Sequence, residues 1–75
     1  MILQQGQVYK VINNTDEKFI LKEIKFDNIQ NTVIIILFNN GQEWEINYNS
    51  ELFKYLVLDK QYDSVTEACN KEFIG

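Results

Sequence analysis

Glu43 and Glu45 are the pair of residues in this sequence whose spacing comes nearest to catalytic chemistry. On a β-strand they would share one face about 6.8 Å apart, because side chains alternate and each residue advances ~3.4 Å. Two carboxylates at such a separation can serve as acid and base. A chain of 75 residues has little room for a substrate cleft. We therefore interpret the pair as a solvated polar face that, together with Glu51, forms an acidic patch open to a basic partner protein.

The sequence lacks the residues on which other site chemistry depends. Histidine is absent, and Cys69 is the one cysteine. Zinc sites of the usual kind and nucleophiles activated by histidine therefore cannot form. Phosphate-binding loops and calcium-binding loops do not occur either. We expect no catalytic residue, no cofactor and no bound metal.

Charge limits the partners of this chain. Its net charge is −4, and its seven basic residues are all lysines scattered along the sequence. Nucleic-acid binding depends on a basic surface that neutralises phosphates, so we expect no direct contact with nucleic acid. An acidic surface favours basic protein partners instead.

Composition also indicates where the protein acts. A single cysteine excludes an internal disulfide, which favours a reduced, cytoplasmic protein with Cys69 as a small core residue. No apolar run approaches the ~18 residues of a membrane span, and the N-terminus does not resemble a secretory signal. Heavy use of Ile, Asn and Lys without proline or arginine is typical of AT-rich genomes, such as those of low-GC bacteria and their phages.

Five strands and one helix are expected from the pattern of apolar residues. The strands are predicted over 7–12, 17–27, both arms of a hairpin spanning 32–48, and 55–59. The second strand changes parity midway, which a bulge or bend near Lys22 would explain. Residues 50–53 are expected to form a short turn or 3₁₀ segment, and a helix through 51–58 is the alternative.

Asn40-Gly41 suits the centre of a type I′ turn and therefore predicts the register of the hairpin, with Leu37 opposite Trp44. One face is then a continuous apolar surface and the best candidate for the core. It carries Val33, Ile35, Leu37, Trp44, Ile46 and Tyr48. The other face has an aliphatic row beside a row of acids. It carries Ile34, Ile36 and Phe38 next to Glu43, Glu45 and Asn47.

A C-terminal helix is predicted over 64–74. Ser64 and Glu67 have the spacing of a capping box, and Gly75 follows where a C-cap would lie. An apolar stripe at helical spacing consists of Val65, Ala68, Cys69 and Phe73. We expect this stripe to cover the row Ile34, Ile36 and Phe38, which contributes roughly 1.5–3 kcal/mol for each side chain buried. The alternative is that the row remains open as a docking or self-association surface.

The spacing of several residues resembles that of SH3-like or Tudor-like small β-barrels. Leu3, Gly6 and Val8 match the lead into the first strand of such barrels, and Phe38, Asn40 and Gly41 match a hairpin. The resemblance covers residues 3–59 and leaves the helix as an addition. It implies a binding module, because these barrels mostly hold ligands in grooves between loops, and it transfers no functional residue to this chain.

We therefore predict a single domain over 1–75, mainly β with one α-helix, built as a five-stranded bent antiparallel sheet or small SH3-like barrel. The expected function is that of a non-enzymatic protein-interaction module, as in an accessory protein of a phage or mobile element. The alternative is an acidic inhibitor that blocks a basic nucleic-acid-binding groove of a host protein. Candidate partner-binding residues are Ile34, Ile36, Phe38, Glu43, Glu45 and Glu51.

Overall fold

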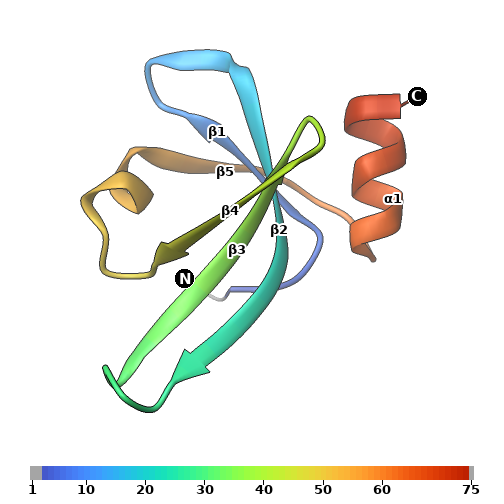
Figure 1. The fold of residues 1–75 in the computed structure, drawn as a ribbon. Coiled ribbons are helices and arrows are strands. Elements are labelled where there is room, and N and C mark those ends of the chain that lie inside the picture. The colour runs from blue at the N-terminus through green and yellow to red at the C-terminus, as the bar shows by residue number, and fades with distance from the viewer. Residues whose placement is uncertain (1–2, 75) are drawn as a thin grey trace.

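A computed structural model describes residues 3–74, and within them every side chain except those of residues 14–16 and 74. The described chain forms one antiparallel sheet in the order β4-β3-β2-β1-β5 with a helix at its C-terminal end (Figure 1). This arrangement confirms the predicted fold class. The strands are β1 (Gln7–Val11), β2 (Asn14–Asp27), β3 (Thr32–Asn39), β4 (Gln42–Asn47) and β5 (Leu56–Gln61).

The β3–β4 hairpin has the register that its turn predicts. Asn40 and Gly41 both adopt positive φ angles, 45° and 89°, as a type I′ turn requires. Leu37 lies opposite Trp44, and Ile35 lies opposite Ile46. The turn therefore determines which side chains of both strands face the core.

The long strand β2 contains the predicted irregularity. The pairing of β2 with β3 shifts between Leu21 and Glu23, so Lys22 is the extra residue of a bulge. The bulge lets Leu21 and Ile24 face the same side, and it bends the strand. Beyond it the β2–β3 hairpin projects past the core (Figure 1), and Ile29 at its tip is 95% exposed.

The main core lies on the concave face of the sheet, against the 3₁₀ helix η1 (Glu51–Tyr55). Phe53 of η1 packs between the rings of Tyr9 and Tyr48, at centroid distances of 5.7 and 5.2 Å. The alternative helix through 51–58 is wrong, because η1 ends at Tyr55 and β5 follows directly. The buried members of this core are Tyr9, Leu21, Ile35, Leu37 and Phe53.

Trp44 departs from the prediction that placed it in this core. Its register is as expected, yet its side chain is 47% exposed. β4 and β5 are the two edges of the sheet and do not pair, so the sheet is not closed beside Trp44. The core face therefore extends to the surface at this point.

The C-terminal helix consists of α1 (Val65–Cys69) and a π-helical turn η2 (Asn70–Ile74). Ser64 begins it as predicted, since its Oγ accepts a hydrogen bond from the Glu67 amide at 3.1 Å. The proposed C-cap, Gly75, lies outside the described residues. The helix covers the opposite face of the sheet from the main core (Figure 1).

The helix packs on a different set of residues from the one predicted. Its stripe of Val65, Ala68, Cys69 and Phe73 forms a second cluster with Val8, Ile20, Phe38 and Tyr62. The prediction is right for Phe38 and wrong for Ile34 and Ile36, which are not part of this cluster. The chain leaves β5 beside β1, so the helix begins over β1 and β2 and reaches β3 only at the Phe38 end.

Candidate functional site

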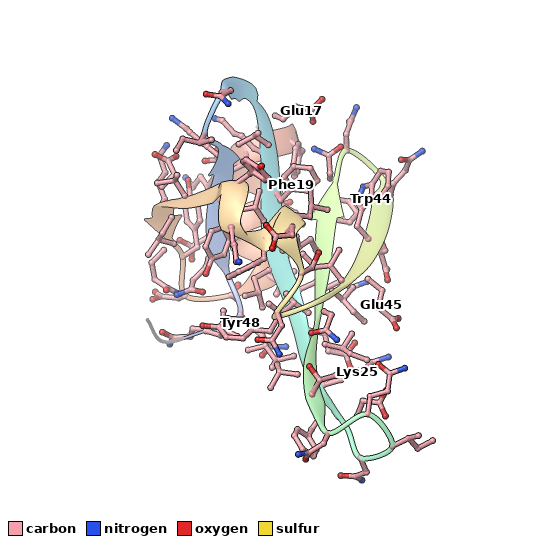
Figure 2. All side chains as sticks on the ribbon, turned by 90° about the vertical axis from the view of Figure 1, so that its left-hand side faces the viewer. Glu17, Phe19, Lys25, Trp44, Glu45 and Tyr48 are labelled. Atoms are coloured by element: carbon pink, nitrogen blue, oxygen red, sulfur yellow. The ribbon has the colours of Figure 1, made fainter. Side chains whose placement is uncertain are left out.

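An apolar groove opens at the unclosed side of the sheet, between β4 and η1. We call it the β4–η1 groove, and its volume is about 210 Å³. Figure 2 shows two of its walls, Phe19 from β2 and Trp44 from β4, at the same end of the molecule. The residues that line it are Phe19, Leu37, Trp44, Ile46, Leu52 and Leu56.

Two of these residues expose much of their apolar surface to water. Trp44 is 47% exposed, and Leu52 is 55% exposed. Full burial of a large apolar side chain contributes roughly 1.5–3 kcal/mol. Trp44 and Leu52 are only partly buried in the folded chain, so part of this free energy is not gained on folding. A partner that covered the groove would gain this contribution. Tryptophan is also the residue type enriched at the energetic centres of protein interfaces.

Local chemistry explains why Leu52 is exposed. Ser50 caps η1, with its Oγ accepting a hydrogen bond from the Leu52 amide at 3.1 Å. In a short 3₁₀ turn the adjacent Leu52 and Phe53 cannot both point inward, and Phe53 fills the core. Neither Leu52 nor Phe19 was predicted as a site residue. The sequence did contain a signal for Leu52. Leu52 and Phe53 are adjacent large apolar residues in a segment of one turn, so one of them had to face outward.

The candidate acids Glu43, Glu45 and Glu51 come from two elements. Glu43 and Glu45 share the face of β4 opposite to Trp44, and Glu51 begins η1. Glu43 forms an exposed ion pair with Lys22, and Glu51 forms one with Lys54 at 3.2 Å. Exposed pairs of this kind contribute little stability. Among the described side chains, Glu45 has no ion-pair or hydrogen-bond partner.

The candidate aliphatic row is largely withdrawn from solvent, and the helix helps to cover it at Phe38. Ile36 is only 6% exposed, and it lies between Glu23 of β2 and Glu45 of β4 in the sheet. Ile34 and Phe38 are half-buried. The hydrocarbon stems of charged neighbours can cover such a row while their charges stay in water. Ile36 therefore offers little surface to a partner.

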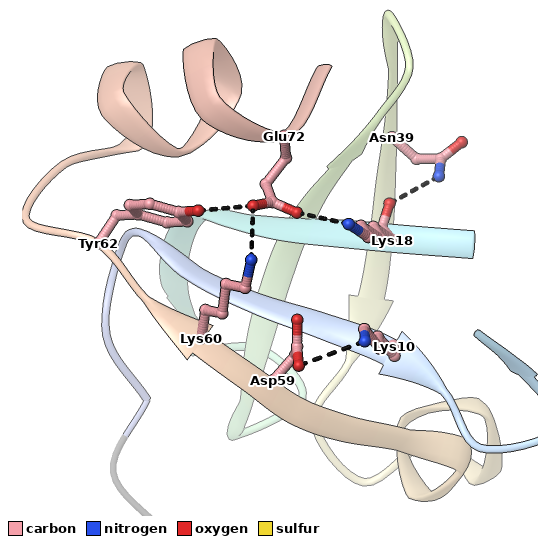
Figure 3. Close-up of polar contacts among 7 residues, drawn as sticks. All are labelled: Lys10, Lys18, Asn39, Asp59, Lys60, Tyr62 and Glu72. Atoms are coloured by element: carbon pink, nitrogen blue, oxygen red, sulfur yellow. Dashed lines mark hydrogen bonds and ion pairs between the residues drawn. The ribbon is translucent and has the colours of Figure 1, made fainter. Parts of the chain in front are cut away.

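A polar cluster centred on Glu72 fastens the helix to the sheet (Figure 3). The Glu72 side chain is 3% exposed, and it accepts from Lys18 Nζ at 2.9 Å and from the Tyr62 hydroxyl. Lys60 Nζ lies 3.5 Å away on the same carboxylate. The hydrogen bond from Lys18, followed by that from Tyr62, lowers the pKa of Glu72 to about 2. The same carboxylate raises the pKa of Tyr62 to about 12.

This cluster has an evident structural role and was missed by the sequence analysis. Glu72 falls on the buried stripe of the helix, at the spacing of Val65, Ala68 and Phe73. A charge on such a stripe is the signal that could have identified it, since a carboxylate is rarely buried without partners.

The described side chains include no group of acidic, histidine and cysteine residues that could hold a metal ion. In the same part of the chain, no helix has the length and apolar character needed to cross a membrane. No protein-family model, curated protein or solved structure matches this chain.

Proposed function

We propose that this chain is a non-enzymatic protein-binding module that takes an apolar side chain of a basic partner segment into the β4–η1 groove. The observation that carries the proposal is the half-exposed Trp44 in a groove lined by six apolar residues. The net charge of −4 supports a partner of opposite sign.

The dimensions of the groove favour a side chain over a free small molecule. Its volume of about 210 Å³ lies below the roughly 300–1,000 Å³ of typical ligand pockets. It is also open along one side, where β4 ends the sheet. A protein segment that lies across the surface and inserts one residue suits this shape.

The topology supports the same class of function. Successive hairpins lead from β1 to β4, and the chain then returns through η1 to pair β5 with β1. We propose that this is an SH3-like barrel left open between β4 and β5, and folds of that kind mostly serve as binding modules.

The inhibitor of a nucleic-acid-binding groove is the less favoured function. Such a role benefits from a continuous acidic surface. Glu43, Glu51 and Asp59 each pair with a lysine of this same chain, which reduces the charge available to a basic groove. The β4–η1 groove, by contrast, is lined by apolar residues alone.

Selection of peptides from a random displayed library on the purified protein tests the proposal. Trp44 is the one tryptophan of the chain, so its fluorescence reports on the groove directly. We expect enriched peptides with apolar and basic residues, which shift Trp44 emission to shorter wavelength. Leu52→Ala should weaken their binding by about tenfold, which corresponds to about 1.4 kcal/mol.

Ile29→Ala is the matched control, because Ile29 is an exposed apolar residue at the tip of the β2–β3 hairpin and not in the groove. It should leave peptide affinity unchanged. Failure to enrich any peptide would overturn the proposal. Enriched peptides that alter neither Trp44 emission nor the affinity of Leu52→Ala would do so as well.

A further inference from the structure

The backbone of β4 has an alternating pattern of used and open hydrogen-bonding groups. The Tyr48 amide donates to the Val33 carbonyl at 2.8 Å, which makes this a hydrogen-bonded pair of the β3–β4 ladder. Such pairs recur at every second residue of an antiparallel ladder. Trp44 and Ile46 therefore bond inward to β3.

Glu43 and Glu45 consequently point their backbone N–H and C=O groups away from β3. β4 is the terminal strand of the sheet, so no other strand within the described chain lies along this side. At the next such position the Asn47 carbonyl is already used, since it accepts from the Ser50 amide at 2.8 Å. The open stretch of the edge is therefore centred on Glu43 and Glu45.

The side chains on either side of this open edge differ in character. Glu43 and Glu45 project from one face of β4. Glu43 already forms an exposed ion pair with Lys22, whereas Glu45 has no partner among the described side chains. Trp44 and Ile46 project from the other face, into the groove. Because residues directly opposite in a ladder share a face, an added strand would place alternate residues against acids and against the groove.

We propose that the partner segment binds as a sixth strand antiparallel to β4, with lysine or arginine opposite Glu43 and Glu45 and an apolar residue opposite Trp44. This inference rests on the proposed function and specifies how the groove is used. Main-chain hydrogen bonds would provide affinity, and the alternating side chains would provide specificity.

Charge opposes a second copy of this chain bound through its own β4 strand. Two β4 strands joined antiparallel through Glu43 and Glu45 would bring these carboxylates opposite one another. Like charges directly opposite in a ladder are destabilising. The same carboxylates favour a basic strand, so they select the partner and also discourage edge-to-edge self-association.

The probe is a synthetic peptide, acetyl-Val-Lys-Val-Lys-Val-Thr-amide, whose lysines match Glu43 and Glu45 and whose central valine matches Trp44. We expect it to shift Trp44 emission and to protect the amides of Glu43 and Glu45 from hydrogen exchange. Methylation of the backbone amide nitrogens of both lysines should abolish binding, because these backbone N–H groups face β4. N-methylation of the central valine should be tolerated, because its N–H faces away.

Charge reversal supplies the protein-side test. Glu45→Lys should weaken binding of the peptide by about tenfold or more. The control is Glu23→Lys, with the same change of charge on β2, which lies two strands from the edge at a distance of about 10 Å. This control should change affinity by no more than about twofold, because exposed charges at that distance are largely screened at physiological salt.

The outcomes separate this inference from the proposed function. Absence of binding by this peptide, equal effects of the two N-methylations, or unprotected amides at Glu43 and Glu45 would each overturn strand addition. The groove itself would stand if library peptides still shifted Trp44 emission and lost affinity in Leu52→Ala. A dimer in light scattering that Glu45→Lys tightens would show a second copy on this edge and would also refute a basic strand there.

Discussion

The ring of Phe73 lies edge-on against the ring of Phe38, with centroids 5.7 Å apart and planes inclined by 71°. Phe38 is the last apolar residue of β3 before the Asn40-Gly41 turn, and Phe73 lies in the final turn of the C-terminal helix. This contact joins the end of the chain to the β3–β4 hairpin. The helix thus connects β3 to β1 and β2 across the convex face of the sheet.

Phe73→Ala should therefore lower the free energy of unfolding by about 2 kcal/mol, less than a fully buried phenylalanine because Phe73 is half-buried. Urea unfolding followed by Trp44 fluorescence measures the loss. Ile29→Ala removes an apolar side chain that is 95% exposed and should change stability by less than about 0.5 kcal/mol. Equal effects of the two substitutions would contradict this account of the helix.

The Glu72 cluster should make the folding stability of the protein depend on pH in the acidic range. The pKa of Glu72 is lowered to about 2 by Lys18 and then Tyr62, from an ordinary value of 4.5. A depressed carboxyl pKa stabilises the folded state above the unfolded pKa, and the stabilisation is lost as the pH falls through the folded value. Stability from this source is therefore complete above about pH 5 and disappears between about pH 4.5 and pH 2.

Glu72→Gln tests this dependence, because it keeps the shape of the side chain and removes the charge. Other carboxylates titrate in the same range, so the quantity to compare is the stability difference between wild type and variant at each pH. We expect a difference of roughly 1–3 kcal/mol near pH 6, narrowing toward pH 2. A difference that is independent of pH would show that the charge of Glu72 does not stabilise the fold.

Substitutions at two adjacent residues of η1, Leu52 and Phe53, should have different effects on folding stability. Leu52 is 55% exposed, whereas Phe53 contacts the rings of Tyr9 and Tyr48 in the core. Phe53→Ala should cost about 3–5 kcal/mol, and Leu52→Ala should cost less than about 1 kcal/mol because its side chain is more than half exposed. Thermal unfolding by circular dichroism measures both. A large loss in Leu52→Ala would mean that Leu52 supports the core and does not serve mainly as a binding residue.

Local sequence signals predicted the structure correctly where a single turn, cap or change of alternation determines it. Asn40-Gly41 determined the β3–β4 register, and Ser64 determined where the helix begins. The change of parity in β2 predicted the bulge at Lys22. Each of these signals acts over a few residues and leaves few alternatives.

The positions that were wrong depend on how distant elements meet. Trp44 is on the predicted face, but its burial requires β4 and β5 to approach, and the sheet stays open between them. The helix was assigned to the aliphatic row because that row needed cover. Its actual position follows from β5 ending beside β1, which is a property of the topology and not of the row. The β4–η1 groove arises from the same opening and could not be derived from local pattern.

Two glycines with nearly equal φ angles should respond differently to a methyl group. Gly6 has φ 91° and Gly41 has φ 89°, so alanine is strained at both positions by roughly 1–3 kcal/mol. At Gly41 an added Cβ meets nothing within 4 Å, because the hairpin turn is in open space. At Gly6 it would lie 2.6 Å from the main-chain oxygen of Tyr62, and the main chain would have to move.

Gly6 is also bonded on both sides. Its amide donates to the Leu21 carbonyl at 3.0 Å, and its carbonyl accepts from the Tyr62 amide at 3.0 Å. Movement at Gly6 therefore disturbs the segment that leads from β5 into the helix. Gly6→Ala should cost about 2 kcal/mol more than Gly41→Ala in urea unfolding, because the close contact of the added Cβ with the Tyr62 oxygen forces the main chain to move. Similar losses in the two variants would show that the strained φ alone, and not the close contact with Tyr62, requires glycine at residue 6.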